Sequence, residues 1–82
     1  MNIIIYSRKN CLPCYATKRE MEKRGFRFTL IDIEQNPSTA AKLRAAGHSQ
    51  LPVVITDDMC WSGFRPDMIN RLPRPGARVK NA

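Results

Sequence analysis

The stretch that decides the fold is Ile3-Ile4-Ile5-Tyr6-Ser7-Arg8-Lys9-Asn10-Cys11-Leu12-Pro13-Cys14. The run from Asn2 to Tyr6 is mostly β-branched and aromatic and shows no alternation, which is typical of a central strand covered on both faces of a parallel or mixed sheet. Pro13 is tolerated only in the first turn of a helix, so a helix is predicted to begin at residue 12 or 13. A cysteine pair with CxxC spacing therefore lies between a strand and the N-terminus of a helix.

The rest of the chain continues as alternating strands and helices. The first helix is predicted to end near Arg24, with Gly25 as its C-terminal stop. The later elements are predicted as a strand over 28–33, a helix opened by Asn36-Pro37 and stopped at Gly47, a hairpin of 53–56 and 59–61, and a helix over 65–72. A compact strand, helix, strand unit implies a right-handed parallel crossover. The order β-α-β-α-β-β-α, with a four-stranded mixed sheet, is the α/β arrangement of a minimal thioredoxin (glutaredoxin-like) fold.

Length and composition set limits on the number of domains. The chain has 82 residues, of which 43% are apolar and 26% charged, the usual mix of one small soluble domain, predicted over residues 1–72. Residues 73–82 are rich in proline and basic residues and are predicted to be a basic tail without fixed structure. The longest aliphatic run is far shorter than the roughly 18 residues of a membrane span, and no secretory signal is recognisable, so a cytoplasmic location is expected.

The candidate catalytic residues are Cys11 and Cys14. Thiol–disulfide exchange needs a thiolate, but an ordinary cysteine, with a pKa of about 8.5, is mostly protonated at neutral pH. Unpaired N–H groups at a helix N-terminus stabilise a thiolate, and Arg8 and Lys9 add positive charge if they point toward it. We predict that Cys11, on the loop side, is the exposed attacking thiol and that Cys14, one turn further in, is the shielded resolving thiol.

A zinc site is the alternative reading of the cysteines. Zinc needs four ligands, and the only further candidates are Cys60 and His48, which are isolated in the sequence, so no metal is expected. An odd number of cysteines, three, also cannot close a disulfide framework within one chain. Cys60 is predicted to be a small buried strand residue, and His48 a solvated loop residue.

The formal net charge of +7 raises a nucleic-acid hypothesis. Basic residues dominate 1–27 and 65–82, whereas acidic residues outnumber them in 28–64. No aromatic stacking platform or reader motif accompanies the basic ends, so no specific nucleic acid is expected as a partner. A basic face that steers acidic protein partners is the preferred interpretation.

Two further motifs follow the cysteine pair. Leu51-Pro52 stands directly before the apolar strand, where thioredoxin-like folds place a cis-proline facing the cysteines, and a cis bond is predicted despite its low base rate. The second motif is Trp61-Ser62-Gly63-Phe64-Arg65-Pro66-Asp67. Its aromatic residues are core candidates, while Gly63 suits a positive-φ turn.

With these motifs, the chain resembles the NrdH-type redoxins, small glutaredoxin-like proteins that behave functionally like thioredoxin. The resemblance extends through Leu72 and is carried by the opening strand, the CxxC segment with 16–19, the segment 50–54 and above all the segment 61–67. It implies that a substrate chain contacts Leu51, Pro52, Trp61, Ser62, Gly63, Phe64 and Arg65. Pro13 departs from the glutamine common in the family, which puts the redox potential in question.

The resemblance also implies partners. The expected activity is electron delivery to a class Ib ribonucleotide reductase, by a monomer that a flavin-containing thioredoxin reductase recharges from NADPH. No cofactor is expected to bind the chain itself. The alternatives are a glutathione-dependent glutaredoxin or, from another class, a zinc- or nucleic-acid-binding module. Weak glutathione binding is inferred, because Leu51 and the segment 62–65 replace the Thr-Val-Pro and Gly-Gly-x-Asp motifs of glutathione-using relatives.

Overall fold

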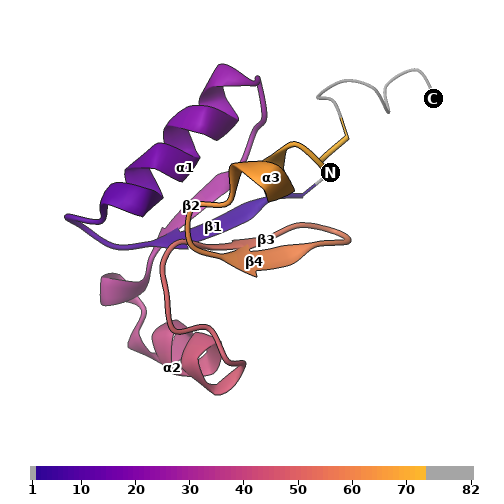
Figure 1. Cartoon of the computed structure of the whole chain (residues 1–82). Coiled ribbons are helices and arrows are strands. Elements are labelled where there is room, and N and C mark those ends of the chain that lie inside the picture. Colours follow the sequence, from indigo (N-terminus) through magenta and orange to yellow (C-terminus); the bar gives the residue numbers. More distant parts are fainter. Residues whose placement is uncertain (1, 74–82) are drawn as a thin grey trace.

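The computed structural model describes residues 2–73 and shows a four-stranded sheet with helices on both sides (Figure 1). In chain order the elements are β1 (Ile4–Ser7), α1 (Leu12–Lys23), β2 (Thr29–Asp32), a 3-10 turn (Ile33–Gln35), α2 (Pro37–Ala45), β3 (Val53–Ile55), β4 (Cys60–Ser62) and α3 (Pro66–Ile69). This is the predicted order of a minimal thioredoxin fold. The predicted tail lies outside the described residues from residue 74 onward.

The sheet is mixed, with strand order β2-β1-β3-β4. β1 pairs in parallel with β2, Ile5 lying opposite Leu30, and antiparallel with β3, where Ile5 lies opposite Val54. β3 and β4 form an antiparallel hairpin in which Val54 faces Trp61. The prediction of a central first strand is therefore confirmed, and β4 is an edge strand.

The core lies on one side of the sheet, under α1 and α3, while α2 lies on the opposite side (Figure 1). It is formed by buried residues from the sheet, α1, α3 and the segments next to them: Ile3, Ile5, Met21, Phe26, Val54, Trp61, Ile69 and Leu72. α2 contributes no buried residue. The expectation that β1 is covered on both faces is wrong in part, because Ile4 and Tyr6 on the α2 side are only half-buried. The molecule thus has one well-packed layer and one open layer.

Local sequence signals determine both ends of α1. Cys11 is the N-cap residue in an extended conformation (φ −113°, ψ 104°), and Pro13 lies in the first turn. The helix ends at Lys23, and Gly25 has a φ of 81°, a left-handed conformation that costs glycine little. Inside the helix the fully buried Thr17 donates its hydroxyl to the Pro13 carbonyl at 2.9 Å, so its polar group is satisfied.

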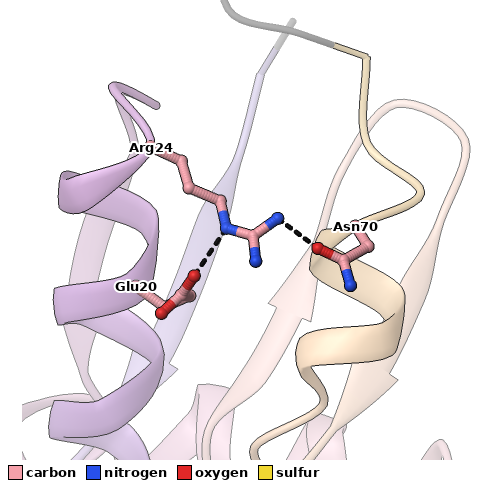
Figure 2. Close-up of polar contacts among 3 residues, drawn as sticks. All are labelled: Glu20, Arg24 and Asn70. Atoms are coloured by element: carbon pink, nitrogen blue, oxygen red, sulfur yellow. Dashed lines mark hydrogen bonds and ion pairs between the residues drawn. The ribbon is translucent and has the colours of Figure 1, made fainter.

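A polar bridge joins α1 to the chain just after α3. Figure 2 shows Arg24 between Glu20, one turn earlier, and Asn70. The Arg24 Nε donates to Glu20 Oε2 at 2.6 Å, and a terminal guanidinium nitrogen donates to Asn70 Oδ1. The i, i+4 spacing predicts the Glu20 contact. The Asn70 contact, across 46 residues of sequence, depends on the packing of α1 against α3.

The β3–β4 hairpin forms without the glycine that such turns commonly contain. Thr56 replaces it: its backbone N–H donates to the Met59 carbonyl at 2.8 Å, and its side-chain oxygen accepts the N–H groups of Asp58 and Met59. Because the Thr56 side chain makes hydrogen bonds within the turn, the turn can form with Asp57-Asp58 at its tip.

Two details of the helix predictions are wrong. The last helix, predicted over 65–72, ends at Ile69, and the chain continues to Leu72 in turns with i to i+3 hydrogen bonds. Asn36 occupies the N-cap position of α2, but its side chain makes no capping bond. Its amide donates instead to the Asp32 carbonyl at 3.0 Å, because the 3-10 turn folds the chain back on β2.

Candidate active site

A disulfide joins Cys11 and Cys14 at the start of α1, with their Cα atoms 5.2 Å apart. Because Cys11 is the N-cap residue, its sulfur lies next to the unpaired N–H groups of the first turn. The Cys14 N–H donates to Cys11 Sγ at 3.2 Å. When the disulfide is reduced, this donor and the positive end of the helix dipole favour negative charge on Cys11. The CxxC is thus built for redox chemistry.

The predicted difference in exposure between the two cysteines is small. Cys11 is 7% exposed and Cys14 is 3% exposed, so the expectation of an exposed Cys11 is wrong for this disulfide-bonded form. The two cysteines still differ in position, since Cys11 lines the neighbouring groove and Cys14 is not among the lining residues described.

A groove of about 780 Å³ lies on the surface beside Cys11, and we call it the Cys11 groove. Its lining comes from the β1–α1 loop, the start of α1, the 3-10 turn, α2, the segment before β3 and the turn after β4. The lining residues are Arg8, Asn10, Cys11, Leu12, Pro13, Ile33, Ala40, Leu43, Arg44, His48, Ser49, Gln50, Leu51, Val53, Gly63 and Phe64. The exposed Leu12 and Phe64 are large apolar side chains of the groove, and Arg8 and Arg44 are its cationic ones.

The Leu51–Pro52 bond is cis, as predicted. Pro52 is fully buried, and its carbonyl accepts the Gly63 N–H at 2.8 Å, which ties the segment before β3 to the turn after β4. Among residues 2–73, no backbone group pairs with the N–H or carbonyl of Leu51. The backbone of Leu51, in the lining of the groove, therefore retains unused hydrogen-bonding capacity.

Gly63 is required where the two segments meet. Its φ is 81°, and a Cβ built there would lie 3.0 Å from Gln50 Oε1. A side chain at this position would be strained by the backbone conformation, and the Gln50 side chain would have to shift to admit it. The predicted positive-φ turn is confirmed.

The structure brings together only some of the residues predicted to contact substrate. Leu51, Gly63 and Phe64 line the groove together with the catalytic candidate Cys11, whereas Pro52 is buried and is not among the lining residues described. Trp61 is 4% exposed and belongs to the core, in agreement with the prediction that it is a core candidate. Ser62 is half-buried on β4. No sequence signal pointed to the α2 residues Ala40, Leu43 and Arg44, because only tertiary structure brings this helix to the groove.

Arg65 lies outside the lining residues and pairs with Asp67. Its Nε and a terminal nitrogen donate to the two carboxylate oxygens of Asp67 at 3.1 and 2.9 Å. The side-chain hydrogen bond from Arg65 lowers the pKa of Asp67, and the same bond raises the pKa of Arg65. Both groups are exposed, so solvent screens this pair.

The predictions for Cys60 and His48 are corrected in one respect each. Cys60 is a strand residue, as predicted, but it is exposed rather than buried. Side chains alternate along β4, so when Trp61 points into the core, Cys60 points to the α2 side, where α2 provides little cover. His48 is a half-buried rather than a solvated loop residue, and its Nε2 lies 3.4 Å from Cys60 Sγ.

Within residues 2–73, no group of three or more histidine, cysteine, aspartate or glutamate side chains is placed to hold a metal ion. In the same part of the chain, none of the helices has the length and apolar character needed to span a bilayer.

Comparison with known proteins places this geometry in a family. The Glutaredoxin family model matches residues 3–61. Glutaredoxin-like protein NrdH of Escherichia coli K12 is 59% identical over 78 residues, which cover 94% of this chain and 96% of that protein. The Lactococcus lactis subsp. cremoris protein of the same name is 31% identical over 70 residues, covering 85% and 97%.

Solved structures agree with the sequence comparison. The NrdH-redoxin from E. coli, a glutaredoxin-like protein described as having a thioredoxin-like activity profile, superposes with a TM-score of 0.87 at 59% identity, covering 92% of this chain and all of that one. A glutaredoxin from Archaeoglobus fulgidus gives a TM-score of 0.75 at 23% identity, covering 89% of this chain and 86% of that one, and so shares the fold.

Proposed function

This chain belongs to the glutaredoxin family, as a redox protein of the glutaredoxin-like NrdH type, and on this premise we propose that it reduces a protein disulfide, that of a class Ib ribonucleotide reductase. We further propose that thioredoxin reductase reduces it in turn, with electrons from NADPH, in the cytoplasm. The observation that carries the proposal is the Cys11–Cys14 disulfide at the N-terminus of α1, with Cys11 in the lining of the groove.

The reaction consists of two exchanges. The thiolate of Cys11 attacks one sulfur of the partner disulfide, a mixed disulfide forms, and the other partner sulfur leaves as a thiolate that takes up a proton. The thiol of Cys14 then loses its proton, and its thiolate attacks Cys11 Sγ and expels the second partner sulfur. The partner gains two electrons and two protons, and the chain ends with the disulfide seen in the structure.

The surroundings of Cys11 support its role as the attacking group. The Cys14 N–H already points at Cys11 Sγ, so a thiolate there is met by a preformed donor. Arg8 lies in the same groove and adds positive charge, whereas Lys9 is not among the lining residues described. These features favour negative charge on the sulfur of Cys11 once the disulfide is reduced.

The groove supports a protein substrate. The Leu51 N–H and carbonyl, which pair with no backbone group among residues 2–73, lie beside the cis-proline. They suit an extended partner segment that pairs with them as a short added strand. Such backbone pairing holds a partner disulfide beside Cys11 and does not itself depend on the side chains of the partner segment. Leu51, Gly63 and Phe64 are the residues we propose for this contact. The buried Pro52 and Trp61 support the two segments from below.

The test is a coupled assay that follows NADPH oxidation. We expect thioredoxin reductase to reduce the oxidised chain directly, and we expect the reduced chain to sustain turnover of a class Ib ribonucleotide reductase as its sole dithiol. Glutathione with glutathione reductase should support the chain poorly, because the motifs that grip glutathione are replaced. Efficient turnover with glutathione, and none with thioredoxin reductase, would identify a glutathione-dependent glutaredoxin instead.

A further inference from the structure

The charges of the Cys11 groove all have one sign. Arg8 comes from the loop after β1 and Arg44 from α2. No aspartate or glutamate is among the described residues that line the groove. Within residues 2–73 the ion pairs are Arg24 with Glu20 and Arg65 with Asp67, so neither groove arginine has a carboxylate partner there.

We propose that the groove selects an acidic, extended segment of the partner protein, with carboxylates that flank the partner disulfide paired to Arg44 and Arg8. This inference rests on the proposed function, because it concerns the substrate of the same groove. Two guanidinium groups from different elements, both without a carboxylate partner within residues 2–73, are suited to carboxylates held along one chain.

An extended segment matches this arrangement. Such a chain advances about 3.3–3.6 Å per residue, and side chains on one face recur every second residue. When its backbone pairs with Leu51 and its disulfide meets Cys11, carboxylates a few residues away on either side come toward the two arginines. The apolar side chains of Leu12, Leu43 and Phe64 provide contact area for the rest of the segment.

Electrostatic complementarity of this kind acts mainly on the rate of encounter and on specificity. A basic groove raises the local concentration of an acidic segment and lowers that of a basic one, and salt screens the effect over about 10 Å at 0.1 M. The predicted signature is therefore a charge preference in the second-order rate constant that weakens as salt is added.

Arg44 is the residue to vary, since it lies on α2 and outside the exchange chemistry. Arg27 is the matched control: it is exposed, is not among the residues lining the groove, and precedes β2 at the end of the sheet away from the cysteines. Arg44→Glu and Arg27→Glu change the net charge by the same amount, so a difference between them reports the groove. Circular dichroism of both variants checks that α2 remains folded.

The experiment measures reduction of three synthetic disulfide peptides that differ only in the flanking residues, which are acidic, neutral or basic. We expect the wild type to reduce the acidic peptide about tenfold faster than the basic one at low salt. Arg44→Glu should remove or invert this order, and Arg27→Glu should keep it.

Equal rates for the three peptides, or equal losses in the two variants, would overturn the inference and leave the proposed function standing, since the neutral peptide is still reduced. Reduction of none of the peptides would overturn both. A third outcome is that glutathione disulfide is reduced faster than the acidic peptide, with the same sensitivity to Arg44→Glu. It would show that the arginines bind glutathione, and it would overturn the inference of an acidic protein segment.

Discussion

Two cysteines of the same motif have different surroundings. Cys11 is the N-cap, accepts the Cys14 N–H and lines the groove, whereas Cys14 is enclosed in the first turn of α1. A thiol that a partner can reach starts the exchange, and an enclosed thiol resolves it. The proposed division of roles therefore rests on position on the helix more than on the small difference in exposure.

We predict opposite effects for the two serine variants. Cys11→Ser should abolish disulfide transfer, whereas Cys14→Ser should keep the first attack and accumulate a mixed disulfide with the partner. Non-reducing electrophoresis and mass spectrometry of the trapped species distinguish them, with Cys60→Ser as the control that retains activity. A mixed disulfide that forms in Cys11→Ser but not in Cys14→Ser would reverse the assignment.

At the scale of elements, helix termini organise the molecule. Glycines with positive φ follow α1 and α2, and a proline opens α1, α2 and α3. The short α3 also carries Asp67 in its first turn, where the positive end of the helix dipole favours a carboxylate. This carboxylate accepts two hydrogen bonds from Arg65. This pair lies at the entry to a helix that covers the core, and its exposure to solvent keeps its contribution to stability small.

Because of the Arg65–Asp67 pair, the free energy of unfolding should decrease as the pH falls through the acid range. The side-chain hydrogen bond from Arg65 lowers the pKa of Asp67 below its ordinary value of 3.8 in the folded chain. The unfolded chain therefore takes up the proton first as the pH falls, and the stabilisation, complete above that ordinary value, is lost as the pH passes through the lower folded-state pKa.

We predict that Asp67→Asn makes the urea midpoint less sensitive to acid. Between about pH 5 and about pH 3 the wild type should lose more stability than the variant, because the variant lacks this titrating group. The exposure of both partners keeps the difference small, so the two proteins are compared in the same buffers. Parallel acid titrations would contradict a stabilising role for the pair.

The whole molecule is asymmetric about its sheet. α1 and α3 cover a buried core, and α1 contains the fully buried Thr17 and Met21. α2, on the other side, has no buried residue, although it supplies Arg44 and Leu43 to the groove (Figure 1). The well-packed side holds the cysteine pair, and the weakly packed side supplies part of the groove lining.

This asymmetry predicts uneven hydrogen exchange. Amides of α2, over Pro37–Ala45, should exchange through local opening at a lower free energy than amides of α1 and β1, which require global unfolding. Native-state exchange in increasing denaturant measures both. Equal protection of α1 and α2 would show that the two layers unfold as one unit.

Much of the fold could be predicted because its signals are local. The apolar run of β1, Pro13, Gly25, Gly47 and the motif around Pro52 each constrain the backbone over a few residues. The helix start, the two helix ends and the cis bond agree with the prediction, whereas β1 begins two residues later than predicted. The bounds of α3 were less accurate, since its last residues are held by turns. The Thr56 turn shows how a side-chain hydrogen bond can replace an expected glycine.

The sequence by itself determined that a CxxC pair stands at a helix N-terminus, because strand composition and proline act where they occur. Only the tertiary structure decided which residues face that pair, that Arg24 reaches Asn70, and that Cys60 is exposed beside His48. The reason is physical: these contacts depend on how elements pack across a sheet. β4 is an edge strand, and α2 has no buried side chain. Their sequences therefore show no apolar periodicity from which their neighbours could be predicted.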